Sequence, residues 1–160
     1  MLSLQTIFGR GMQFYTLLEE AAEAAHDASK ALHQLVRDPD REPALDAFRL
    51  ARLRTRETSN QISQELVDSF ITPMEREDIE ALGSALYRIP KQIEKFADRY
   101  ALAMQNLEHI DFAPRAAMLE QAAGVVVKMV RLLPKMKLEP MKALNDELRA
   151  INDRDRKSVV

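Results

Sequence analysis

Residue types that carry much of the chemistry of other proteins are missing or scarce in this chain. Its 160 residues include no cysteine and no tryptophan, and only four are glycine. Without cysteine there can be no disulfide, thiolate metal site or cysteine nucleophile, which fits the reducing cytoplasm that we expect as its location. Four scattered glycines form no glycine-rich loop of the kind that cradles phosphate groups.

The chain also lacks a strong charge of either sign. It has 23 basic and 25 acidic residues mixed along its length, so its net charge is only -2. Nothing in this balance resembles the basic footprint of a nucleic-acid-binding protein. No apolar run approaches the roughly 18 residues of a membrane span, and the first ten residues lack the pattern of a secretory signal. We therefore expect a protein that neither spans a membrane nor binds nucleic acid.

Helical periodicity is present over most of the chain. Apolar residues recur at spacings of three and four, which predicts helices at about residues 12–37, 43–70, 73–107, 114–134 and from 140 onward. The short connections make sequential helices antiparallel neighbours. We predict an all-α antiparallel bundle of about five helices in a single domain, residues 1–160, with an N-terminal arm at 1–11 and a frayed tail at 152–160.

Two apolar faces within these helices predict much of the core. The first helix should turn one face inward, formed by Phe14, Leu18, Ala21, Ala25, Ala28, Leu32 and Leu35. The third helix should do so along a heptad seam, formed by Ile79, Leu82, Leu86, Ile89, Ile93, Phe96, Tyr100, Ala103 and Leu107.

The break between the second and third helices is sharply specified. Thr72 is typical of an N-cap, Pro73 of the first helical position, and Glu75 of the acid that completes a capping box. We therefore expect a tight helix-to-helix corner with the third helix restarting at Pro73.

Motifs for catalysis or metal binding are weak. Glu23 and His26 have the Glu-x-x-His spacing of di-iron bundles, but His33 and His109 do not supply a second copy. Glu23 also lies nearly opposite Ala25 on the helix, so it should face outward. No arrangement predicts a nucleophilic triad. The pattern therefore favours a protein without metal, cofactor or catalytic residues.

Three arginines form a stripe on the second helix, since Arg49, Arg52 and Arg56 are spaced three and four apart. One interpretation is a binding site for an acidic partner. The other is a solvated face paired with nearby glutamates.

The chain resembles the PhoU-like family of phosphate transport regulators, in the branch that accompanies Pit-type transporters. The more specific match is the segment Phe70-Ile71-Thr72-Pro73-Met74-Glu75-Arg76-Glu77-Asp78-Ile79, and a weaker one is the opening helix from Phe14 to Ala22. The resemblance implies an all-α fold of two three-helix units and a non-enzymatic role at the cytoplasmic side of a phosphate transporter. Some members of the family bind clustered iron or zinc through carboxylates.

The chain departs from the family where those carboxylates would lie. Glu57 matches the first acid of the second helix. Other residues occupy the remaining acidic positions, namely Gln61, Tyr87, Arg88, Lys91, Asn145 and Arg149. This exchange of acids for amides and cations predicts no metal cluster. Lys91 or Arg88 could then pair with Glu57 in place of the metal, or these side chains could reach solvent.

We therefore expect a cytoplasmic, non-enzymatic regulator of phosphate transport that acts by protein–protein contact. Members of the family usually have a further helix, so the last two helices here should expose an apolar face that homo-oligomerisation could cover. One alternative is a generic helical adaptor or dimerisation module without a phosphate role. Another, from a different class, is a metal-binding helical bundle.

Overall fold

The computed structural model describes residues 4–38, 45–107 and 109–158. In this part of the chain it consists of helices without any strand, so the predicted all-α bundle is confirmed. The elements are α1 (Leu4–Arg37), α2 (Asp46–Asp68), α3 (Arg76–Ala103), η1 (Met104–Asn106), α4 (Ala113–Leu132), η2 (Leu133–Lys135) and α5 (Leu138–Ser158). None of these described helices has a stretch that is both long and apolar enough to cross a membrane.

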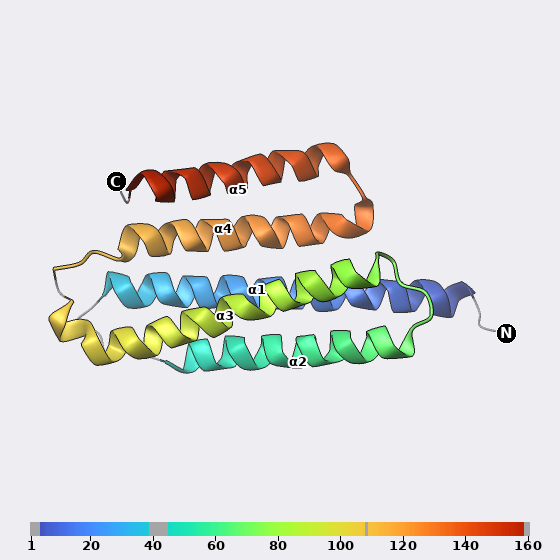
Figure 1. The fold of residues 1–160 in the computed structure, drawn as a ribbon, viewed down its shortest axis with the longest axis horizontal. Coiled ribbons are helices and arrows are strands. Elements are labelled where there is room, and N and C mark those ends of the chain that lie inside the picture. The colour runs from blue at the N-terminus through green and yellow to red at the C-terminus, as the bar shows by residue number, and fades with distance from the viewer. Residues whose placement is uncertain (1–3, 39–44, 108, 159–160) are drawn as a thin grey trace.

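The central helix is α1, and sequential helices run antiparallel to one another (Figure 1). α1 packs against α2, α3 and α4, and α2 packs against α3, so the first three helices form a unit with α4 on its outer side. Among the described elements, α5 packs against α4 alone. The last helix therefore has a single neighbour.

The core follows α1 along its length. One buried cluster surrounds its first half and contains Phe14, Leu18, Ile79 and Val130, while the second contains Leu32 and other residues of α1 to α4. The apolar face predicted for the first helix is buried except at Leu35, which is half-buried. Burial of that face is the main force that fixes the helix in the bundle, because isolated helices are marginal in water.

Small polar side chains fill the interface between α1 and α2 without weakening it. The buried hydroxyls of Ser29, Thr55 and Thr58 each donate to a backbone carbonyl of their own helix, at 2.9 to 3.2 Å. Such satisfied hydroxyls avoid the cost of an unpaired buried polar group. Their small size lets the two helices approach closely.

Both ends of the chain are more helical than predicted. Residues 1–11 were expected as an arm, but α1 already begins at Leu4, and residues 152–160 were expected to fray, but α5 continues to Ser158. Helix propagation adds one hydrogen bond for each residue fixed, so an established helix extends easily until a strong breaker. Gly9 and Gly11 are too weak as breakers to stop it. The predicted start at Pro43 lies outside the described residues.

The predicted capping box at the α2–α3 corner is wrong. α3 begins at Arg76 rather than Pro73, with Glu75 as the N-cap residue and no side-chain capping bond. The Thr72 hydroxyl donates to the carbonyl oxygen of Met74 at 2.7 Å, so it closes a turn instead of accepting from a helical N–H. The carbonyl of Glu75 then accepts the first helical bonds, from the backbone N–H groups of Asp78 and Ile79.

Candidate functional site

The residues at the former acidic positions do not come together as hypothesised. Glu57 and Gln61 lie exposed on α2, and no described ion pair joins Glu57 to Arg88 or Lys91. The Lys91 ammonium lies 5.6 Å from the centre of the Tyr87 ring on its own helix, within reach of a cation–π contact. Of the two alternatives for these side chains, the structure favours solvent for Arg88, which is exposed, and a contact along α3 for Lys91.

The arginine stripe is divided between internal and exposed roles. Arg52 bridges α2 and α3 through an ion pair with Glu94 at 2.5 Å, and this hydrogen bond raises the pKa of the arginine further. Arg49 pairs with Asp46 of its own helix at 3.6 Å, while Arg56 is exposed. The Arg52–Glu94 pair therefore joins two helices of the three-helix unit, and an acidic partner at this stripe stays a prediction.

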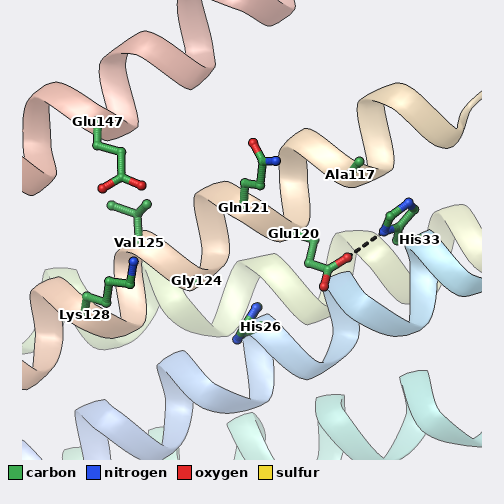
Figure 2. A pocket seen from close by; sticks show the side chains of 9 residues that line it. All are labelled: His26, His33, Ala117, Glu120, Gln121, Gly124, Val125, Lys128 and Glu147. Carbon is green, nitrogen blue, oxygen red and sulfur yellow. Dashed lines mark hydrogen bonds and ion pairs between the residues drawn. The ribbon is translucent and has the colours of Figure 1, made fainter.

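A groove between α1, α4 and α5 is lined by several titratable side chains (Figure 2). Its volume is about 400 Å³, and its polar lining comes from His26, His33, Glu120, Gln121, Lys128 and Glu147. The Nδ1 atom of His33 lies 2.6 Å from Oε2 of Glu120, so this pair ties α1 to α4. Sequence reasoning missed the groove because its members lie far apart in the chain.

The groove offers little for catalysis or metal binding. In the described part of the chain, no three histidine or acidic side chains come close enough together to hold a metal ion. The lining described here contains no hydroxyl or thiol that a histidine could activate as a nucleophile. The Glu23-x-x-His26 motif is also split, since Glu23 pairs with Arg131 of α4 at 2.5 Å while His26 points at Gly124.

His26 packs tightly in this groove. A Cβ atom on Gly124 would lie 3.3 Å from its Nε2, so any larger residue there would require the ring to shift by a few tenths of an ångström. Burial is the main cause that lowers the pKa of His26 below its ordinary value of 6.5, and Lys30 lowers it further. Glu120 and Asp27 act in the opposite direction but do not outweigh these two effects.

The shifted pKa of His26 predicts an acid-sensitive fold. Since the unfolded chain binds this proton more tightly, the contribution of His26 is complete above pH 6.5 and is lost as the pH falls through its lower folded pKa. We expect His26→Gln to flatten the fall of the unfolding free energy between about pH 7 and pH 5. Urea titrations at several pH values measure this slope. The exposed His109→Gln is the control, and an equal effect of both substitutions would contradict the prediction.

The α2–α3 corner presents an exposed apolar surface that sequence reasoning did not recognise. The exposed fractions are 95% for Phe70, 63% for Ile71 and 80% for Val67. A phenylalanine that is almost fully exposed, beside two other exposed large apolar residues, is typical of a contact surface. We call Val67, Phe70 and Ile71 the apolar corner.

The backbone of this corner is held firmly although its side chains are exposed. The guanidinium of Arg76 donates to the carbonyl oxygens of Leu66 and Ser69, which lie at the end of α2. Ser69 is buried, and its N–H donates to the carbonyl oxygen of Glu65 at 3.0 Å. A cation at a helix C-terminus satisfies the last carbonyls and interacts favourably with the helix dipole. Phe70 is therefore displayed from a fixed turn.

Acidic residues lie on both sides of the apolar corner. Asp68 ends α2, Glu75 precedes α3, and Glu77 and Asp78 lie in the first turn of α3. The last three are exposed. Acids in a first helical turn also stabilise the helix dipole, so part of this arrangement is structural. The corner nevertheless combines exposed apolar side chains with acidic side chains on both sides of them.

Comparison of the chain with family models, with curated proteins and with solved structures gave no match.

Proposed function

We propose that this protein is a non-enzymatic helical adaptor that binds a protein partner through the apolar corner. The observation that carries this proposal is the exposure of Phe70 on a turn that Arg76 holds in place. A backbone turn that is already held before binding loses less conformational entropy in the complex, which favours affinity. Large aromatic residues of this kind are often the anchors of interfaces.

The partner that we propose is a phosphate transporter, bound on its cytoplasmic side. The segment Phe70 to Ile79 carries the resemblance to the PhoU-like family, and it coincides with the corner. Cytoplasmic loops of membrane proteins are enriched in lysine and arginine. An apolar corner flanked by Asp68, Glu75, Glu77 and Asp78 is complementary to an apolar pocket with a basic rim. The protein would then influence phosphate uptake by contact, without chemistry of its own.

A membrane pull-down tests both parts of this proposal. Tagged wild-type protein is incubated with detergent-solubilised membranes from its own organism, and the captured proteins are identified by mass spectrometry. We expect capture of a phosphate transporter and a loss of about tenfold or more in captured protein for Phe70→Ala. Leu102→Ala is the matched control, because Leu102 is 90% exposed at the opposite end of α3.

The outcomes separate the phosphate transport regulator from the generic helical adaptor. Capture of other proteins, with a loss on Phe70→Ala, would favour a generic helical adaptor without a phosphate role. Equal capture by wild type, Phe70→Ala and Leu102→Ala would show that the corner is not the contact surface.

A further inference from the structure

An apolar groove runs along α4 on a different part of the molecule. Between α4 and α5 it has a volume of about 590 Å³ and an apolar lining of Met118, Leu119, Ala122, Leu148 and Ile151. A second hollow of about 270 Å³ adjoins it towards α3 and shares Arg115 and Leu119 with the first. The two hollows together form a groove whose walls are α5 and α3. We call it the α4 groove.

The apolar floor of the α4 groove results from the packing of α5. Because α5 packs on α4 alone among the described elements, the side of α4 that faces away from α1 is only partly covered. The rings of Phe96 and Phe112 pack edge to face at 5.5 Å beside this floor, so the α3 end of the groove is also apolar. The α4 residues that line the two hollows run from Arg115 to Ala122, so the groove follows about two turns of α4, roughly 10 Å.

The wall formed by α5 carries three cationic side chains along its edge, and Asp155 lines the groove beside them. Arg149 lines the groove, and Lys142 and Arg156 lie seven residues before and after it, which places all three on one face of α5. All three are exposed. Lys142 pairs with Glu139 at 3.2 Å, whereas no ion pair within the described residues engages Arg149.

The wall formed by α3 carries the same charge. Gln92 lines the groove. Arg88 lies four residues before Gln92, and Lys95 and Arg99 lie three and seven residues after it, so these cations share one side of α3 with Gln92. These three side chains are exposed. In the floor, Arg115 lies 3.8 Å from Asp155. Exposed cations therefore lie along both walls of the α4 groove, while Asp155 adds one negative charge to its lining.

We propose that the α4 groove binds an acidic amphipathic helix of a partner protein. A helix of this kind would lay its apolar face on Leu119, Ala122 and Ile151 and direct its carboxylates to the basic walls. The lined part of α4, from Arg115 to Ala122, sets the length over which the partner helix would contact this floor, about two turns. This proposal does not depend on the apolar corner or on the phosphate role.

Charge and shape argue against the other occupants. A two-fold contact between two copies at this surface would bring the same patch of both copies together, so the cationic side chains around Arg149 from both copies would share one interface. Like charges placed opposite one another across an interface are unfavourable. A flat anionic membrane would meet the basic walls but would not reach the apolar floor between them. An acidic helix satisfies both the walls and the floor.

The test uses two designed peptides of three heptads each, with leucine at the a and d positions. One carries glutamate at its other charged positions and the second carries lysine at the same positions. Fluorescence anisotropy with the full chain measures binding at low and high salt. We expect the glutamate peptide to bind at least about tenfold tighter than the lysine peptide, with weaker binding at high salt.

Substitutions of the protein locate the binding. Arg149→Glu should weaken the glutamate peptide about tenfold, and Leu119→Ser should weaken it through the floor of the groove. Arg56→Glu is the matched control, since Arg56 is an exposed arginine on α2 and should leave binding unchanged. Circular dichroism melts of each variant report whether the fold is kept.

Three results would overturn the proposal. The first is equal binding of the two peptides, and the second is a loss for Arg56→Glu that matches the loss for Arg149→Glu. The third is an absence of peptide binding combined with one of two other findings. These are dimerisation of the protein at micromolar concentration, or binding of the protein to phosphatidylglycerol vesicles that is lost in Arg149→Glu. A failure of the membrane pull-down would not contradict the proposal for the α4 groove, because the two experiments probe different surfaces.

Discussion

Replacing Phe14 with alanine is expected to lower the free energy of unfolding by about 3–5 kcal/mol. Phe14 is 0% exposed and belongs to the core cluster that joins α1 to the other three helices around it. The substitution removes the ring and leaves a cavity that the surrounding helices fill only partly. Because small domains have a total stability of about 5–15 kcal/mol, the variant should be close to unfolding. Urea denaturation followed by circular dichroism at 222 nm measures the difference.

Phe70→Ala is the matched control for this prediction. It removes the same ring from a side chain that is 95% exposed, so the unfolding free energy should change by less than about 0.5 kcal/mol. The pair of variants separates the two roles of phenylalanine in this chain, one in the core and one on the surface. A loss of less than about 1 kcal/mol for Phe14→Ala would contradict the central position that we assign to this cluster.

The sequence predicted the helices and their buried faces well because helix periodicity and burial have the same physical cause. The predicted inward positions Phe14 and Leu18 on α1 are buried, as are Ile79 and Leu86 on α3. An apolar side chain repeated at three and four residues has to face the core if the helix is to be stable. This rule holds for a long helix whatever its neighbours are.

Contacts between helices could not be predicted in the same way. The ion pairs Arg52–Glu94 and His33–Glu120 join residues far apart in the chain, and their distances depend on the relative rotation of the helices. A sequence pattern gives the face of a residue but not its height along a neighbouring helix. For this reason sequence spacing could suggest a pair between Lys91 and Glu57 but could not show that Lys91 lies against Tyr87 of its own helix.

The candidate contact surface was missed for a related reason. Phe70 continues the spacing of three and four residues at which apolar side chains recur on α2. Periodicity alone therefore gives no reason to expect it outside the core. Its exposure results from the end of the helix at Asp68, where the chain turns and the helical spacing no longer applies. Thr72 likewise has the sequence of an N-cap, but the turn that Arg76 stabilises places the first residue of α3 later.

Arg76→Ala is expected to destabilise the protein by about 1–2 kcal/mol. It should also weaken partner capture about tenfold, although Phe70 itself is not substituted. The substitution removes the guanidinium that satisfies the carbonyls of Leu66 and Ser69, so the end of α2 and the turn after it lose two charged hydrogen bonds. The apolar corner would then be ordered only in the complex, and that ordering reduces affinity. Urea denaturation, membrane capture and amide hydrogen exchange at residues 69–75 measure the three consequences.

Arg76→Lys and Arg88→Ala complete the test of how the corner works. Lysine keeps the positive charge but not the fork of donors that reaches two carbonyls at once, so its effect should lie between those of wild type and alanine. Arg88 is an exposed arginine of the same helix, away from the corner, and its removal should change neither stability nor exchange at residues 69–75. Unchanged exchange in Arg76→Ala would mean that the turn is ordered without the guanidinium. The affinity of the corner would then depend on its apolar side chains alone and not on the order that α3 imposes on the end of α2.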